Sequence, residues 1–180
     1  MKIAIIGWGS LLRYKKALEI DGEWQGDGPF LPLEFSYISK NKLLTLAILP
    51  GSRGVQTLWA LSNFHDIDDA MKALKMLLKT ELENIAFISR TNENDNYRIT
   101  PEIVQDLLTW AEQKELEALV WVDFKSNFKQ TTEMDFNEDN VIDFINDLTK
   151  IEQLAVEKYI INNPEQIETT IRQKLRTEFG

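Results

Sequence analysis

The apolar residues of this chain change their spacing once, and that change limits the folds open to it. Up to about residue 63 they alternate or run continuously, in residues 33–38, 43–49 and 55–61, which is typical of β-strands. From residue 66 onward helical spacing dominates, interrupted by strand-like runs at 85–89 and 118–124. The chain is therefore predicted to be an α+β protein, in which helices cover a mixed sheet.

Turn residues and helix signals give the expected elements. The three early strands are separated by Lys40-Asn41-Lys42 and by the segment PGSRG, so an antiparallel meander is expected. Asp66 opens a helix with an apolar stripe from Ala70 to Leu78, and Thr100 followed by proline opens a second helix. The last third is predicted to be helical, over residues 137–148, 151–161 and 165–177, with Ile167, Ile171 and Leu175 on one docking face.

Length and charge restrict the class of protein. The 180 residues, 43% of them hydrophobic and 27% charged, have the balance of one globular domain over residues 1–180. We see no apolar run of roughly 20 residues and no signal-peptide pattern, so a cytoplasmic protein is expected. The absence of cysteine removes disulfides and thiolate chemistry. A net charge of −9 argues against nucleic acid and membranes as partners and favours a small molecule or another protein.

The first strand ends in the segment IIGWGSLL, which is the first candidate for a binding site. Glycine at positions 7 and 9 permits backbone angles closed to other residues, so successive N–H groups can converge on an anion such as a carboxylate. The segment formed by Gly7, Trp8, Gly9, Ser10 and Leu11 is therefore a candidate ligand-binding loop. The alternative interpretation is a tight turn between two core elements.

These segments, taken in order, resemble the γ-glutamylcyclotransferase-like family, in particular a bacterial branch of it. The resemblance rests on Gly-Ser-Leu after the first strand, followed by GPFLPLEFSYIS, LLTLAILPG and VQTLWALS, and weaker similarity continues to the C-terminus. It implies a closed or nearly closed mixed β-barrel, largely antiparallel and flanked by helices. The barrel core would span about residues 1–124, and a helical extension about 125–180. The loop at Trp8–Leu11 would hold a substrate carboxylate, with tryptophan in place of the usual tyrosine.

The same resemblance implies a glutamate that moves a proton while 5-oxoproline forms from a γ-glutamyl amide. Its position in the family pattern Leu-x-x-x-Glu-Gly is taken here by Leu78, and the glycine by Lys79. Leucine cannot transfer a proton, and loss of a positioned general base costs about 10²- to 10⁴-fold in rate.

Two other carboxylates could replace the missing glutamate. Glu81 would share the inward stripe of Leu77 and Leu78 if the helix continued, although a charged residue at a helix end is more often exposed. Glu34 lies within a strand and would face inward only if paired, for example with Arg53 or Arg90, or would otherwise face outward.

Two functions of different classes follow from these residues. The first is an enzyme that cyclises or cleaves a γ-glutamyl amide, with Glu81 or Glu34 as the acid/base. The second is a catalytically inactive ligand-binding or interaction module on the same scaffold. Neither a cofactor nor a metal is expected: the one histidine precedes three aspartates in His65-Asp66-Ile67-Asp68-Asp69, which a helix start explains.

Overall fold

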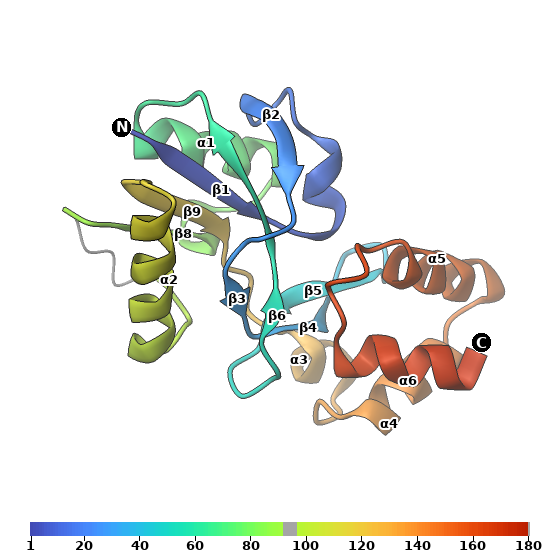
Figure 1. Cartoon of the computed structure of the whole chain (residues 1–180). Coiled ribbons are helices and arrows are strands. Elements are labelled where there is room, and N and C mark those ends of the chain that lie inside the picture. Colours follow the sequence, from blue (N-terminus) through green and yellow to red (C-terminus); the bar gives the residue numbers. More distant parts are fainter. Residues whose placement is uncertain (92–96, 180) are drawn as a thin grey trace. The chain divides into compact units, whose positions relative to one another are not determined.

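The computed structural model describes residues 1–91 and 97–179, which divide into two compact units. Unit 1 contains residues 1–31 and 56–124, and unit 2 contains residues 32–55 and 125–180. The chain thus leaves unit 1 after the first 31 residues and returns to it at Gln56 (Figure 1). In the part described, secondary structure is of both kinds, so the predicted α+β class is confirmed.

Unit 1 is built on a five-stranded sheet of mixed direction. Its strand order is β2-β7-β1-β9-β8, and β1 runs parallel to β9 while the other neighbours are antiparallel. The strands are β1 (Ile3–Gly7), β2 (Ile20–Gln25), β7 (Leu58–Ser62), β8 (Ile85–Ser89) and β9 (Ala118–Val122). Because β2 and β8 each have one strand neighbour in the described part of the chain, the sheet is open there, and the expected closed barrel is not found.

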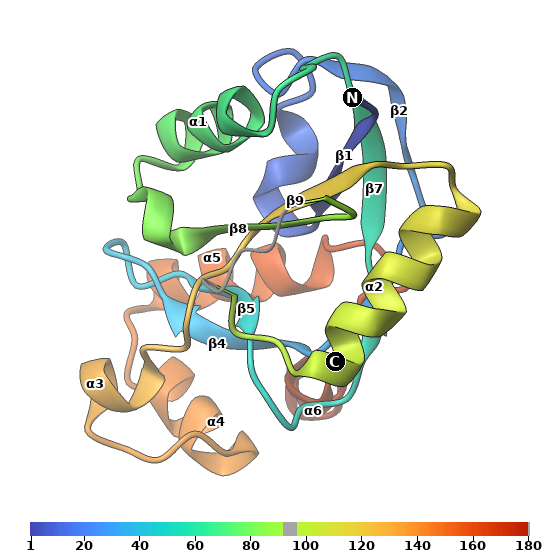
Figure 2. The ribbon, with the colours of Figure 1, turned by 90° about the vertical axis from the view of Figure 1, so that its left-hand side faces the viewer.

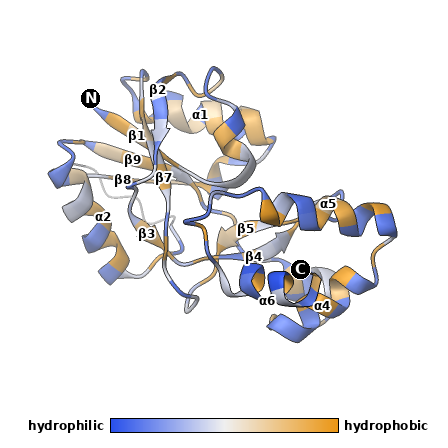
Figure 3. Cartoon of the chain, turned by 45° about the vertical axis from the view of Figure 1, so that its right-hand side comes forward, coloured by the Kyte–Doolittle hydropathy of each residue, from blue (hydrophilic) through white to orange (hydrophobic). Residues whose placement is uncertain are grey.

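The central strands form the core of unit 1. Every residue of β1 and β9 is buried, as expected for strands covered on both faces. Figure 3 shows both strands in the apolar colours along most of their length. The sequence explains this, because IAIIG and ALVWV contain no charged residue.

Two helices cover opposite faces of this sheet (Figure 2). Helix α1 (Ile67–Leu78) begins after Asp66, whose carboxylate accepts the N–H of Asp68, and it packs on β8 and β9. Helix α2 (Pro101–Gln113) begins after Thr100, whose hydroxyl accepts the N–H of Ile103. Both helix starts were predicted correctly from their capping residues. Two short 3-10 helices, η1 (Gly9–Arg13) and η2 (Leu82–Asn84), also belong to unit 1.

Unit 2 is a hairpin covered by helices. Strands β4 (Leu33–Ile38) and β5 (Leu44–Ile48) pair antiparallel, and the helices are α3 (Phe128–Thr132), α4 (Glu138–Asn146), α5 (Lys150–Ile161) and α6 (Thr170–Phe179). Helices α3 and α6 pack on β4, and α5 packs on β5. The apolar residues predicted to dock this segment, Ile167, Ile171 and Leu175, are all buried, but α6 begins at Thr170 and Ile167 precedes it.

The predicted three-stranded meander is wrong. Strands β4 and β5 pair with each other in unit 2, whereas β7 pairs with β1 and β2 in unit 1. The run at 55–61 is also divided, into β6 (Val55–Gln56) and β7. Thr57, between these two strands, forms hydrogen bonds with the loop before β3 (Phe30–Leu31). Its N–H and hydroxyl both donate to the carbonyl of Pro29, at 3.1 and 2.6 Å.

Candidate functional site

The candidate loop follows β1 and begins with a backbone turn that requires glycine. Trp8 is extended, and Gly9 has φ +60°, in the left-handed region that side chains disfavour. Gly9 then starts η1, whose first N–H groups have no partner within the helix. Trp8 and Leu11 are buried, whereas Gly9 and Ser10 are partly exposed. The loop therefore presents the first N–H groups of η1 at partly exposed positions between two buried anchors.

Gly7 is needed for a different reason from the one predicted. It belongs to β1 and has no positive φ, but a Cβ there would lie 2.5 Å from the ring of Trp24. That indole also donates to the carbonyl of Leu12, at 3.1 Å. Trp24 comes from an irregular part of β2, where the register with β7 shifts between Asp21 and Gln25. The bulge thus places an aromatic ring that holds the end of β1 against η1.

A carboxylate lies at the same edge of the sheet as this loop. Strands β1 and β9 are parallel with Ile5 opposite Val120, and they end at Gly7 and Val122, so Trp8 and Asp123 each follow the end of one of two neighbouring parallel strands. Adjacent strands are about 4.8 Å apart. Residues that follow neighbouring parallel strands meet at one edge, which is where open α/β sheets bind ligands. Asp123 was not among the predicted site residues, although a charged residue directly after the buried run ALVWV was a signal for it.

The carboxylate of Asp123 is fully buried and incompletely paired. Neither oxygen accepts a hydrogen bond from the residues that the structure describes. Arg98 donates to the Asp123 carbonyl, and its guanidinium Nη1 lies 3.5 Å from Oδ2. Burial raises the pKa of Asp123 above its ordinary value, and the charge of Arg98 and the side chain of Trp121 oppose that rise. A buried, incompletely paired carboxylate with a raised pKa can accept a proton or bind an ammonium group.

Glu34, one of the two predicted catalytic residues, has another structural role. It is 3% exposed in β4, and its Oε1 accepts the N–H of Phe35 at 2.8 Å. Its Oε2 accepts the N–H groups of Thr170 and Ile171, at 3.1 and 3.4 Å. Burial raises the pKa of Glu34, and these hydrogen bonds oppose the rise. The carboxylate faces inward, but backbone donors at the start of α6 bind it, and not the predicted arginines.

Glu81, the other predicted catalytic residue, does not lie on the inward stripe of α1. The helix ends at Leu78, and Lys79 takes a left-handed conformation with φ +50°. Glu81 lies beyond this stop, with a side chain 73% exposed and paired with Lys75 at 3.2 Å. The condition for its inward orientation, a helix that continues, is therefore not met.

The aspartates after His65 act at a helix start. Asp66 is the N-cap of α1, and Asp68 and Asp69 lie in its first turn, where the helix dipole favours negative charge. Among the residues that the structure describes, no group of three or more histidine or carboxylate side chains is arranged to hold a metal ion. No helix in the described ranges is both long and apolar enough to cross a membrane.

Comparison with known proteins gives no match, since no family model, no characterised protein and no solved structure is significantly similar to this chain. A function must therefore be argued from the structure itself, and the features that we use are the loop after β1 and the buried Asp123.

Proposed function

We propose that this chain binds a small amino-acid-type ligand, of the γ-glutamyl class, where β1 and β9 end. The backbone N–H groups of Gly9 and Ser10 would bind the α-carboxylate of the ligand. Asp123 would bind its α-ammonium group. The observation that supports this most strongly is the parallel pairing of β1 and β9, because the loop after β1 and the buried, incompletely paired carboxylate of Asp123 both follow the ends of these neighbouring strands.

The two groups suit the cyclisation of a γ-glutamyl amide. In that reaction the α-amine attacks the γ-carbonyl carbon, the new C–N bond closes the five-membered ring, and the amide C–N bond breaks. Asp123 would accept the proton from the attacking amine and return it to the departing amine, so that its own state is unchanged overall. Its raised pKa supports this role, because proton transfer is most efficient when the pKa lies near the operating pH.

Membership of the γ-glutamylcyclotransferase-like family is part of this proposal. The α+β class and a loop with a positive-φ glycine after the first strand agree with it. So does the left-handed conformation of Lys79, where the family pattern has glycine. The open sheet and Leu78 depart from that pattern, and Asp123 would have to replace the glutamate from the end of β9, whereas the family position lies in α1.

A second candidate function is ligand binding without turnover. It is favoured by Leu78, which has no proton to transfer. It is also favoured by Glu34, which binds the backbone at the start of α6, and by Glu81, which is exposed and paired with Lys75. Under this candidate the loop still binds a carboxylate, but no bond is broken.

Two measurements on purified protein separate these functions. Release of 5-oxoproline from γ-glutamyl amino acids would be followed together with ligand binding by calorimetry. For the enzyme we expect turnover that falls by about 10²-fold or more in Asp123→Asn, with binding weakened in Gly9→Val. The control is Asp106→Asn, an exposed aspartate on α2 of the same unit, which should leave turnover unchanged.

Other outcomes decide against parts of the proposal. Binding without turnover would support the second candidate, and Leu78→Glu would then test whether the family position can restore a trace of activity. Turnover that survives Asp123→Asn would remove Asp123 as the acid/base. If γ-glutamyl compounds, 5-oxoproline and simple carboxylates all fail to bind, the loop is only a turn.

A further inference from the structure

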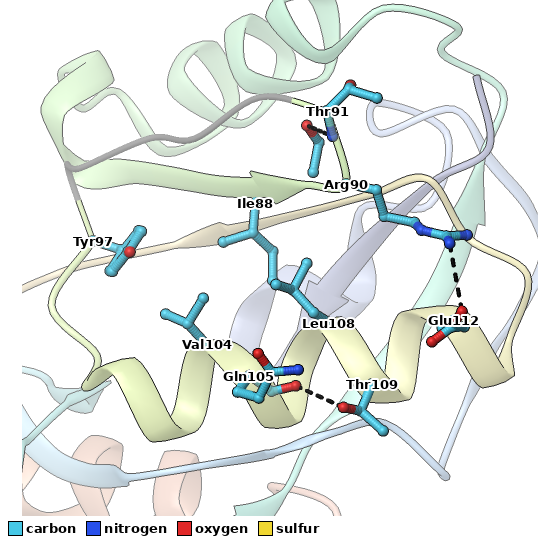
Figure 4. Close-up of a pocket in the computed structure, with 10 residues that line it drawn as sticks. Ile88, Arg90, Thr91, Tyr97, Val104, Gln105, Leu108, Thr109 and Glu112 are labelled. Atoms are coloured by element: carbon cyan, nitrogen blue, oxygen red, sulfur yellow. Dashed lines mark hydrogen bonds and ion pairs between the residues drawn. The ribbon is translucent and has the colours of Figure 1, made fainter.

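A cavity of about 430 Å³ lies between β8 and α2, apart from the candidate site (Figure 4). One wall comes from the end of β8 and the residues after it, and the other from one side of α2. Its volume falls within the range of sites for small molecules, about 300–1,000 Å³. None of the residues that line it belongs to the Trp8–Leu11 loop or is Asp123.

One part of the lining of this cavity is an apolar surface shared by β8 and α2. Ile88 points from β8 toward α2, where Val104 and Leu108, one helical turn apart, face it (Figure 4). Ile88 is 4% exposed, and the two α2 side chains are partly exposed. Tyr97 lies at one end of this surface. These side chains leave room for one apolar group of modest size.

The opposite end of the cavity carries two opposite charges. Arg90 reaches from the end of β8 to Glu112 on α2, with Nη2 and Oε1 3.4 Å apart (Figure 4). Both side chains are more than half exposed, at 54% and 68%. An ion pair of this kind contributes little to stability, about 0–1 kcal/mol, so a ligand can separate it at small cost. The guanidinium has five N–H donors, and this contact involves one nitrogen.

We propose that this cavity binds a free α-amino acid with an apolar side chain, as a zwitterion. The carboxylate of the amino acid pairs with Arg90, its ammonium group pairs with Glu112, and its side chain covers Ile88, Val104 and Leu108. The two charges of an α-amino acid are attached to one carbon, which matches two protein charges that lie in contact. A ligand with only one of these charges would meet a like charge on the protein, so both are required.

The binding experiment compares three ligands that share one side chain. L-phenylalanine carries both charges, 3-phenylpropionate lacks the ammonium group, and phenethylamine lacks the carboxylate. We expect saturable binding of phenylalanine to the full chain by calorimetry, with the two analogues weaker by about tenfold or more. Equal binding of phenylalanine and 3-phenylpropionate, or no saturable binding of any apolar amino acid, would overturn the proposal.

Variants assign this binding to the cavity. Arg90→Gln and Glu112→Gln should each weaken phenylalanine binding by about tenfold, and both residues are exposed enough for the fold to tolerate the change. Leu108→Trp should abolish binding by filling the interior. The matched controls are Arg53→Gln and Glu115→Gln, two exposed charges elsewhere, which should bind as the wild type does. If the controls weaken binding as much as the cavity variants, the site lies elsewhere.

This inference does not depend on the proposed function. Gly9→Val and Asp123→Asn should leave phenylalanine binding at the β8–α2 cavity unchanged. Loss of binding in either variant would show that the amino acid is bound at the candidate site, and would contradict the separate cavity site.

Discussion

The carboxylate of Glu34 accepts the backbone N–H of Thr170 at 3.1 Å, although 136 residues of chain separate them. Thr170 is the first residue of α6, so a buried strand residue satisfies donors that the helix cannot satisfy itself. The negative charge also lies at the positive end of the helix dipole. This single side chain joins β4 to the start of α6 within unit 2.

Removing this carboxylate should loosen the first turn of α6. Glu34→Ala leaves the part-buried N–H of Thr170 and the buried N–H of Ile171 without their acceptor, at a cost of about 1–3 kcal/mol. Amide hydrogen exchange at these two residues should become faster, and the urea midpoint should fall. Glu165→Ala, at an exposed position in the turn before α6, is the control. Unchanged exchange in Glu34→Ala would mean that the cap contributes nothing.

Among the charged residues described in unit 2, Arg172 should be the one whose substitution destabilises the protein most. It is 1% exposed, and its guanidinium donates to four carbonyls, those of Ile161, Asn163, Pro164 and Ile167. Arg172→Met removes all of these donors and should lower the free energy of unfolding by about 3–5 kcal/mol, measured by urea denaturation. Arg172→Lys should rescue little, because an ammonium group cannot donate to four separate acceptors in the same plane. Arg176→Met, whose exposed side chain pairs with Glu168, should cost less than about 1 kcal/mol.

The conformation of Lys79 predicts a stabilising substitution. Its φ of +50° ends α1 in the left-handed region, where any side chain costs about 1 kcal/mol relative to glycine. Lys79→Gly should therefore raise the thermal midpoint, and Lys79→Val should lower it. Lys72→Gly, inside the same helix, should have the opposite sign to Lys79→Gly. A lower midpoint in Lys79→Gly would contradict the assigned helix end.

Local patterns predicted the elements well, and their long-range pairing poorly. Capping residues located the starts of α1 and α2 because the signal lies within a few residues. The partner of β7 could not be read locally, since an apolar alternation fits any neighbouring strand. The start of α6 was placed five residues early, at Glu165, although Thr169 is a local cap whose hydroxyl accepts the N–H of Arg172 at 3.2 Å. The acceptor from Glu34, far away in the sequence, could not be read locally.

In the candidate site, too, the features that depend on neighbouring residues were predicted and those that depend on long-range pairing were missed. The loop after β1 was found from its glycines, and Gly9 has the positive φ that the sequence suggested. Asp123 was missed because its importance depends on the parallel pairing of β1 with β9, which no short segment reveals. For Glu34 the sequence left an inward and an outward orientation open, and the inward one was expected to pair with an arginine; the structure has it buried and bound by backbone N–H groups. The sequence shows that a carboxylate such as Glu34 needs a partner if it is buried, but the identity of that partner depends on the fold.

The free energy of unfolding should depend on pH through Asp123. Burial raises its pKa in the folded protein above the ordinary 3.8, so between these two values the folded state holds more protons than the unfolded state. The free energy of unfolding of the wild type therefore falls as the pH rises through that interval, and the loss persists above the folded pKa. Asp123→Asn removes the buried charge and should remove this dependence.

The measurement is urea unfolding of both proteins at several pH values. Near about pH 4 the variant should differ little from the wild type, and toward about pH 8 it should become more stable by about 1–3 kcal/mol. Arg98 loses its partner in the variant, but its side chain is 30% exposed, so water can solvate it. A wild type that gains stability relative to Asp123→Asn as the pH rises would show that Arg98 outweighs burial. Asp123 would then be ionised with a lowered pKa, which would make it a structural ion pair and a poor proton acceptor at neutral pH.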